Sequence, residues 1–431
     1  MTINLTPDLD LAERLFQMLR EATASADGRG VTRDAYGPGE AKAFAIVTAE
    51  AERLGLHLQR DAACNLLMTL PSQDRSAKRI VLGSHLDSVA NGGNFDGAAG
   101  VLAGLAILSG WRKAGFVPQV DVSVLAIRAE EAGSWFPTSF PGSRAALGRL
   151  PAEALDLPRQ DSGKPLRAYI RDNGGDPEAV AAGRAMLGSE NVDSYLELHI
   201  EQGPVLDTAG IPVGIVSGIP GARRLRAGRV IGQYNHSGAT PRRYRADAAL
   251  ALAELAYRLD EVWCRLEAQG HVLVCTFCVL ATTADAGFTK IPGEAVFQLD
   301  IRSVDTASTA AMYNAFYELA GEIAARRGVR IEPGEETTSL PSTMDGLMQQ
   351  QLAQAARDAE VGFLSMPSGG GHDAVAFAQA GIPSAMLFVR NQNGSHNPDE
   401  AMRMEDFAAA LDVMNRFALA RARHHDDGQA V

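Results

Sequence analysis

The chain has 431 residues, of which 46% are hydrophobic and 21% charged, and its formal net charge is −12. This length exceeds what one hydrophobic core usually supports, so we expect two domains. Lysine and arginine are scattered, which argues against nucleic acid or an anionic membrane as a partner, because both require a local basic patch. The first residues do not resemble a signal peptide, and no apolar run approaches the ~20 residues of a membrane span.

The four cysteines give no disulfide or metal-binding pattern. Cys275 and Cys278 lie in an apolar run typical of a strand, where residues three apart point to opposite faces. No second closely spaced pair is present to complete a metal site. We therefore interpret the cysteines as structural thiols and expect a reducing, cytoplasmic location.

The first two hundred residues alternate between helical and strand patterns. Helices are predicted over 10–21, 39–54 and 96–115, and strands over 79–84, 120–127 and 193–199. This alternation predicts an α/β fold with a mostly parallel sheet covered on both faces. In such sheets, ligands bind beyond the carboxyl ends of the strands.

From about residue 212 the pattern changes to short strands around two long helices. Strands are predicted over 214–219, 225–234, 271–281, 294–303 and 329–333, and helices over 243–268 and 308–327. The order β-α-β-β-α-β is that of a ferredoxin-like α+β domain. The first pattern resumes near 343, with a strand over 385–390 and a helix over 404–423. We therefore predict a discontinuous domain (1–211 and 334–431) interrupted by an inserted domain (212–333).

Polar clusters follow the predicted strands of the larger domain. His85 and Asp87 end one strand; side chains two apart share a face, so the carboxylate can orient the imidazole. Asp96 stands among glycines before a helix, where it could bridge two cations or be an ordinary N-cap.

Two adjacent acids, Glu130 and Glu131, follow another strand. Such a pair is costly at the end of an apolar strand unless it is paired or metal-bound, although a solvated acidic pair is the alternative. One could bind metal while the other faces an attacking water. His199 and His396 end two further strands. Each cluster alone is a weak signal, but together they provide five ligands of the kind that suits two zinc-like ions.

These motifs resemble the di-metal aminoacylase and carboxypeptidase superfamily. Within it, the chain is similar to the N-carbamoyl-L-amino-acid hydrolase branch, whose relatives include allantoate amidohydrolase and β-ureidopropionase. The matching segments occur in family order over most of the chain and include GSHLDSVANGGNFDGAAGVLAGL, RAEEAGSWF, ELHIEQGPVLD, NHSGATPRRYRADA, IPGEAVFQLDIRS, PSGGGHDA and GSHNPDE. ELHIEQGPVL followed by HSGATP distinguishes this branch from the peptidases.

The resemblance implies a zinc-exopeptidase-like catalytic domain with two divalent metal ions, which could be zinc, manganese or cobalt. It implies that His85, Asp96 and His199 hold one ion. Asp96, Glu131 and His396 would hold the other, so that Asp96 bridges the two.

The resemblance also implies roles outside the metal ligands. Glu130 would be the general base, and His236 would stabilise the reacting oxyanion, in relatives often across a dimer. Arg302 would bind the substrate carboxylate, and Gln202 would contact its amide or ureido end. The inserted domain would thus be a lid or dimerisation domain, and a homodimer is expected. His372 could lie behind the metal site or cap the next helix.

The dimer face could include the predicted helix over 243–268. Its leucines, such as Leu250, Leu252 and Leu255, could contact a second subunit or pack on the sheet of their own domain.

Two departures leave the substrate open. Thr289 stands where relatives often carry Asn, and the residues after the Glu-Glu pair differ from the Gly-Ser-Arg-Phe of many relatives. We predict a metal-dependent amidohydrolase that cleaves a C–N bond in a small, carboxylate-bearing N-carbamoyl compound or related linear amide. The alternatives are a metallo-exopeptidase or N-acyl-amino-acid deacylase, and a non-catalytic binding protein. Retention of Glu130, His236 and all five ligand candidates argues against a binding protein.

Overall fold

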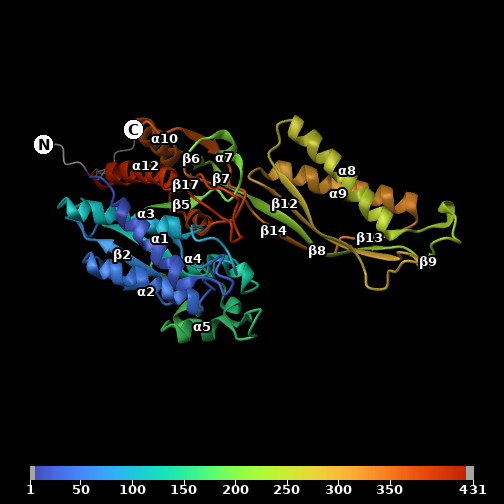
Figure 1. The fold of residues 1–431 in the computed structure, drawn as a ribbon, viewed down its shortest axis with the longest axis horizontal. Coiled ribbons are helices and arrows are strands. Elements are labelled where there is room, and N and C mark those ends of the chain that lie inside the picture. The colour runs from blue at the N-terminus through green and yellow to red at the C-terminus, as the bar shows by residue number, and fades with distance from the viewer. Residues whose placement is uncertain (1–4, 424–431) are drawn as a thin grey trace. The chain divides into compact units, whose positions relative to one another are not determined.

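The computed structural model describes residues 5–423. The chain forms two compact units, a larger one of Met1–Ser217 with Met344–Val431 and a smaller one of Gly218–Thr343 (Figure 1). The boundaries between the two units lie at 217/218 and 343/344, whereas the sequence predicted 211/212 and 333/334. Strand pairing explains the difference. Strand β6 (Val213–Val216) pairs with strands of the larger unit, whereas β14 (Glu335–Ser339) pairs within the smaller one.

The larger unit is built on an eight-stranded sheet in the order β1-β2-β4-β3-β5-β17-β6-β16. The central strands β4, β3, β5 and β17 run parallel to one another, as the alternating pattern predicts. Strand β6 spans Val213–Val216. The other seven strands of this sheet are β1 (His57–Arg60), β2 (Leu66–Leu70), β3 (Arg79–His85), β4 (Val122–Ile127), β5 (Val192–Ile200), β16 (Phe363–Met366) and β17 (Ser384–Val389).

Helices complete this unit, from α1 in blue near the start of the chain to α12 in red near its end (Figure 1). They are α1 (Leu9–Thr23), α2 (Pro38–Arg53), α3 (Ala98–Lys113), α4 (Pro141–Ala146), α5 (Leu166–Asp172), α6 (Pro177–Ala181), α7 (Val205–Ala209), α10 (Gly346–Asp358), α11 (Ala374–Gln379) and α12 (Met404–Arg423), with 3-10 helices η1 (Glu130–Ser134) and η2 (Ala152–Asp156).

Helix α3 packs unusually close to the sheet. Its small residues are buried on all sides, and a Cβ at Gly100 would lie 2.2 Å from the carbonyl oxygen of Leu198. Only glycine permits this approach of helix and strand backbones. The helix therefore begins beside the carboxyl ends of the central strands, two residues after Asp96.

The smaller unit has a sheet in the order β10-β12-β8-β13, with β14 also pairing to β8, and two helices. The order β8-α8-β10-β12-α9-β13 confirms the predicted ferredoxin-like succession. Its elements, besides β14, are β7 (Gly218–Ile219), β8 (Gly221–Ile231), β9 (Asn235–His236), β10 (Val274–Thr282), β11 (Lys290–Ile291), β12 (Glu294–Ser303), β13 (Arg330–Glu332), β15 (Ser342–Thr343), α8 (Ala248–Ala268), α9 (Thr306–Arg327) and the 3-10 helix η3 (Arg242–Tyr244).

The core of the smaller unit lies between its helices and one face of its sheet. Leu252 and Leu255 of α8 pack with Phe297 of β12 and Phe316 of α9. These two leucines therefore pack on their own sheet, whereas Leu250 is exposed.

Within the described residues no helix has both the length and the apolar character required to cross a membrane. All four cysteines are free, and Cys64 is buried.

Candidate metal and catalytic centre

The candidate residues of the larger unit meet at the carboxyl ends of its parallel strands. His85 ends β3 and His199 lies near the end of β5, which is hydrogen-bonded to β3. Beside β3, β4 leads into the turn η1 with Glu130 and Glu131. On the other side of β5, β17 leads into the loop with His396. Residues more than 300 positions apart are thus brought together because neighbouring parallel strands end at one edge.

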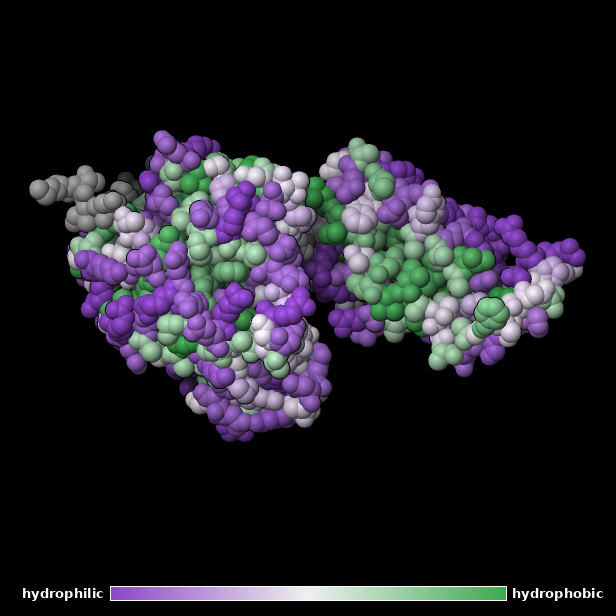
Figure 2. All heavy atoms as spheres, viewed as in Figure 1, coloured by the Kyte–Doolittle hydropathy of each residue, from purple (hydrophilic) through white to green (hydrophobic). Residues whose placement is uncertain are grey.

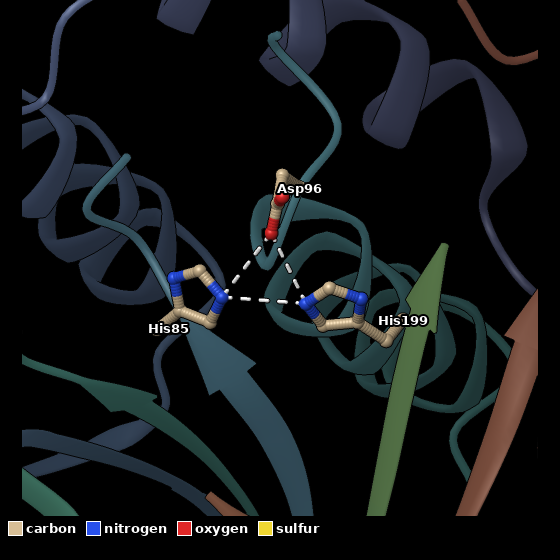
Figure 3. Close-up of side chains that lie close together, drawn as sticks. All are labelled: His85, Asp96 and His199. Atoms are coloured by element: carbon tan, nitrogen blue, oxygen red, sulfur yellow. Dashed lines mark hydrogen bonds and ion pairs between the residues drawn. The ribbon is translucent and has the colours of Figure 1, made fainter. Parts of the chain in front are cut away.

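Three buried side chains converge on one point in Figure 3. Nε2 of His85 lies 3.3 Å from Nε2 of His199, and Oδ1 of Asp96 lies 3.4 Å and 3.2 Å from these two atoms. Nδ1 of His85 contacts the carbonyl oxygen of Asp87, and Nδ1 of His199 contacts that of Ile200. Carbonyl oxygens only accept, so Nδ1 carries the hydrogen and Nε2 of each neutral ring offers a lone pair.

This arrangement fits a cation. Oδ1 of Asp96 is buried and accepts no hydrogen bond from any described residue. Two imidazole nitrogens and one carboxylate oxygen at these distances form a set of ligands that a divalent ion of the zinc type binds. The structure thus places His85, Asp96 and His199 as one group of potential ligands.

A second group of potential ligands shares Asp96. Nε2 of His396 lies 2.7 Å from Oε1 of Glu131 and 3.5 Å from Oδ2 of Asp96. Asp96 therefore turns Oδ1 to the first group and Oδ2 to the second. Oδ2 also accepts hydrogen bonds from Nε2 of Gln202 at 2.8 Å and from Oγ of Ser395 at 2.6 Å.

Asp87 anchors the turn that carries the acid pair. Its Oδ1 accepts the backbone N–H of Glu130 and its Oδ2 that of Glu131, both at 3.0 Å. The same carboxylate lies 3.2 Å from Nδ1 of His85. One buried side chain therefore orients a potential metal ligand and both acids. Oε2 of Glu130 lies 3.9 Å from Nε2 of His85, beside the first group.

The electrostatics of the cluster are dominated by buried carboxylates. Burial raises the pKa of Glu130 well above its usual range, against the opposing effect of His85, and the charge of Glu131 adds to the rise. Burial disfavours a charged His85, but Glu130, Asp87 and Asp96 outweigh this effect and raise its pKa well above the usual range. A site with this excess of negative charge attracts cations.

His372 lies behind the first group. Its ring centroid is 4.5 Å from that of His199, and its Nε2 lies 3.0 Å from Oγ of Ser368. The N-cap of α11 is Asp373, which makes no capping hydrogen bond through its side chain. Of the two alternatives for His372, the structure therefore favours the position behind the metal site.

Glu197 is a residue of this region that the sequence analysis did not single out. This buried residue of β5 accepts hydrogen bonds from Oγ of Ser84 at 3.0 Å and from the backbone N–H of Ala374 at 2.8 Å. It thereby joins β3, β5 and α11 beneath His199. Its position two residues before His199 on a buried strand was the available signal.

The remaining predicted residues belong to the smaller unit. His236 is exposed on β9, and its Nδ1 accepts the backbone N–H groups of Gly238 and Ala239, both at 3.1 Å. Arg302 lies on β12, where its Nε is 2.8 Å from Oδ2 of Asp300. The carbonyl oxygen of Thr289 accepts the N–H of Ser237, next to His236.

Comparison with known proteins agrees with this geometry. The sequence model of peptidase family M20/M25/M40 matches residues 81–420, and the chain belongs to this metal-dependent family. The chain is similar to an N-carbamoyl-L-amino acid amidohydrolase of Geobacillus stearothermophilus, with 34% identity covering 93% of this chain and 96% of that one. It is 31% identical to an allantoate amidohydrolase of Bacillus subtilis, covering 89% and 90%.

A solved structure shares the fold over nearly the whole chain. It is a hydantoinase/carbamoylase family amidase from Burkholderia ambifaria, with a TM-score of 0.86 and 30% identity, covering 97% of this chain and 98% of that one. The resemblance inferred from the motifs is therefore confirmed, as is the α/β fold with a mostly parallel sheet.

Proposed function

We propose that the chain is a metal-dependent amidohydrolase that cleaves a C–N bond in a small, carboxylate-bearing N-carbamoyl compound or a related linear amide. The observation that carries this proposal is the carboxylate of Asp96, which faces two groups of potential ligands beside Glu130, whose side chain is 8% exposed. The named relatives, which are amidohydrolases of carbamoyl amino acids and of allantoate, support the substrate class.

The cofactor is two divalent cations, with zinc, manganese and cobalt as the candidates. His85, His199 and one oxygen of Asp96 would hold the first, and Glu131, His396 and the other oxygen of Asp96 the second. When bound, such a pair polarises a carbonyl group and lowers the pKa of a water molecule.

Glu130 acts as the general base. It takes a proton from the attacking water and delivers it to the leaving nitrogen. Its Oε2 lies 3.9 Å from Nε2 of His85, beside the first group of ligands, and this position supports the role. The hydrogen bond from its backbone N–H to Asp87 fixes the turn from which it reaches the reacting atoms.

His236 donates a hydrogen bond to the oxyanion. Because its Nδ1 accepts two backbone N–H groups, the ring hydrogen is on Nε2, which is free to donate. Arg302 binds the substrate carboxylate, since its planar guanidinium matches a carboxylate in two parallel hydrogen bonds. Asp300 holds that guanidinium in place. Gln202 contacts the amide or ureido end from beside Asp96.

The active molecule is a cytoplasmic homodimer joined through the smaller unit. Strand β10 is an edge strand, and apolar side chains on it and on α8 are exposed, among them Leu250, Tyr257, Val274 and Leu280. Figure 2 shows apolar residues gathered on the visible face of this unit. Unpaired edges with apolar side chains are surfaces that bind another chain. The four free cysteines fit a reducing compartment.

The test is ammonia release from N-carbamoyl amino acids, allantoate and ureidopropionate, with N-acyl amino acids and dipeptides as the contrasting substrates. The enzyme is first treated with chelator and then supplied with manganese, zinc or cobalt. We expect metal-dependent ammonia release from at least one ureido acid. Cleavage of acyl amino acids or dipeptides alone would contradict the proposal and favour the peptidase or deacylase reading.

A further inference from the structure

Arg33 is a fully buried arginine whose side chain contacts the segments that carry the metal-site residues. It follows α1 in the chain, and its exposed fraction is 0%. Its Nε donates to the carbonyl oxygen of Leu86 at 2.7 Å, and one Nη donates to Oδ1 of Asn94 at 3.1 Å. The other Nη donates to the carbonyl oxygens of Asn94 at 3.3 Å and Asp96 at 3.5 Å. All of these acceptors lie next to His85 or within 94–96.

No described carboxylate forms an ion pair with Arg33 within 4.0 Å, whereas other buried arginines such as Arg128 have one. A buried charge is expensive unless it is hydrogen-bonded and offset by opposite charge, and the carboxylates of Glu400, Asp96 and Asp87 attract this guanidinium at longer range. Here the guanidinium is surrounded by carbonyl and amide oxygens, and its planar set of donors spans two segments of chain. That geometry is directional and not simply electrostatic.

Glu400 holds the same loop from its other side. Its Oε1 accepts the backbone N–H of Phe95 at 2.9 Å and that of Asp96 at 3.3 Å. Its Oε2 lies 2.6 Å from Oγ of Ser395. Arg33 thus binds the carbonyl groups of the loop and Glu400 binds its N–H groups. The peptide groups on both sides of Asp96 are thus held by side chains that are not themselves candidate ligands.

The backbone of Arg33 is fixed as well. Its N–H donates to Oγ of Ser88 at 2.9 Å, and its carbonyl oxygen accepts the N–H of Ser88 at 2.9 Å. Ser88 follows Asp87, which anchors the acid pair. The backbone that carries the guanidinium is therefore hydrogen-bonded to the segment that includes Asp87.

We propose that Arg33 is a positioning residue for Asp96. It fixes the orientation in which this carboxylate faces both groups of ligands, and so sets the affinity for metal without touching metal or substrate. This inference rests on the proposed metal centre.

A purely electrostatic role makes the opposite prediction. A positive charge behind Asp96 repels divalent cations, so removing the charge would strengthen metal binding if charge were the dominant effect. If Arg33 acts by position, removing it weakens metal binding although the repulsion is relieved. The sign of the change in affinity therefore decides between the two roles.

The experiment is calorimetric titration of the chelator-treated full-length protein with Mn²⁺. We expect Arg33→Met to bind roughly tenfold to hundredfold more weakly than the wild type, as for other residues that orient metal ligands. Arg33→Lys keeps the charge but loses the planar donors, and it should also bind more weakly. Arg421→Met is the matched control, because Arg421 pairs with Asp193 away from the ligand groups; its affinity should equal the wild type's.

Each outcome has one meaning. Unchanged or tighter Mn²⁺ binding by folded Arg33→Met would overturn the inference while the metal centre stands. Absence of binding by the wild type would overturn the proposed metal centre itself, and with it this role of Arg33. If circular dichroism shows that Arg33→Met does not fold, Asn94→Ala removes one acceptor of the guanidinium instead. It should weaken binding roughly twofold to tenfold, and an unchanged affinity would contradict the proposal.

Discussion

The candidate residues of the two units differ in how they are held. In the larger unit, His85, Asp96 and His199 are buried; besides a neighbouring backbone carbonyl group, each imidazole contacts Asp96, which is more than 100 positions from His199. In the smaller unit, His236 is exposed and Arg302 is 34% exposed, and each is held by neighbours close in sequence.

This difference follows from what each group is proposed to bind. Metal ligands must keep their geometry and lose little water when the ion enters, so burial and multiple contacts favour binding. Groups that bind a substrate must be open to solvent before it arrives. The first group of ligands in the larger unit is therefore buried, whereas the side chains of the smaller unit are accessible; His396 of the second group, which is 50% exposed, lies between these extremes.

Glu130→Gln should have the largest effect on turnover. It removes the proposed base while keeping its size, so kcat should fall by about 10²–10⁴-fold with metal content unchanged. Glu131→Gln is the matched control, since it should lose metal. Metal analysis and steady-state kinetics of both variants separate the two adjacent acids. Near-normal turnover by Glu130→Gln would remove it as the base.

His236→Ala should lower kcat by about 10²–10³-fold, the loss typical of one donor to an oxyanion. Because the side chain is exposed, thermal stability and metal content should not change. The control is His271→Ala. His271 also belongs to the smaller unit, where it hydrogen-bonds to Ser308, and its replacement should leave kcat unchanged. Wild-type kcat in His236→Ala would assign the whole oxyanion interaction to the larger unit.

Arg302→Ala should chiefly raise KM. Loss of a charge-assisted contact with the substrate carboxylate should increase KM roughly tenfold to hundredfold and change kcat little. Arg302→Lys should recover only part of this loss, because lysine lacks the planar pair of donors. The control is a substrate whose carboxylate is amidated, on which wild type and variant should act alike. Equal KM values for the carboxylated substrate would contradict the assignment.

Metal binding should strengthen with pH. In the metal-free protein the hydrogen bond with Glu131 raises the pKa of His396 to about 9. The bound proton stabilises the fold fully below the ordinary histidine pKa of about 6.5, and this contribution is lost as pH rises through the higher value. A cation must displace this proton. Titration with Mn²⁺ at pH 7.5 in buffers of different ionisation enthalpy should therefore show more proton release by the wild type than by His396→Ala. Equal proton release by the two proteins would contradict the raised pKa of His396.

Much of the fold was predictable where the pattern is local. The strand over 294–303 and the helix over 404–423 have the predicted bounds, because alternation and helical periodicity are clear there. The long helix begins at Ala248 and not at 243, because a 3-10 turn follows Pro241 and Asp247 caps the helix.

The candidate site was predictable only in part. Residues such as His85 and Glu131 carry recognisable side-chain chemistry at strand ends, and the structure brings them together. Arg33 and Glu400 act through hydrogen bonds with backbone groups of 86 and 94–96. Any residue supplies such a backbone group, so no sequence motif marks the contact, and only the folded chain reveals these partners.

The anchoring of Glu130 and Glu131 by one carboxylate has a consequence for engineering. Since Asp87 accepts both N–H groups, displacing it would move the proposed base Glu130 and the proposed ligand Glu131 together. Their mutual spacing is thereby insulated from changes elsewhere in the sheet. To change the substrate, the exposed residues of the smaller unit can be varied, while Asp87, Glu130 and Glu131 are kept unchanged as a set.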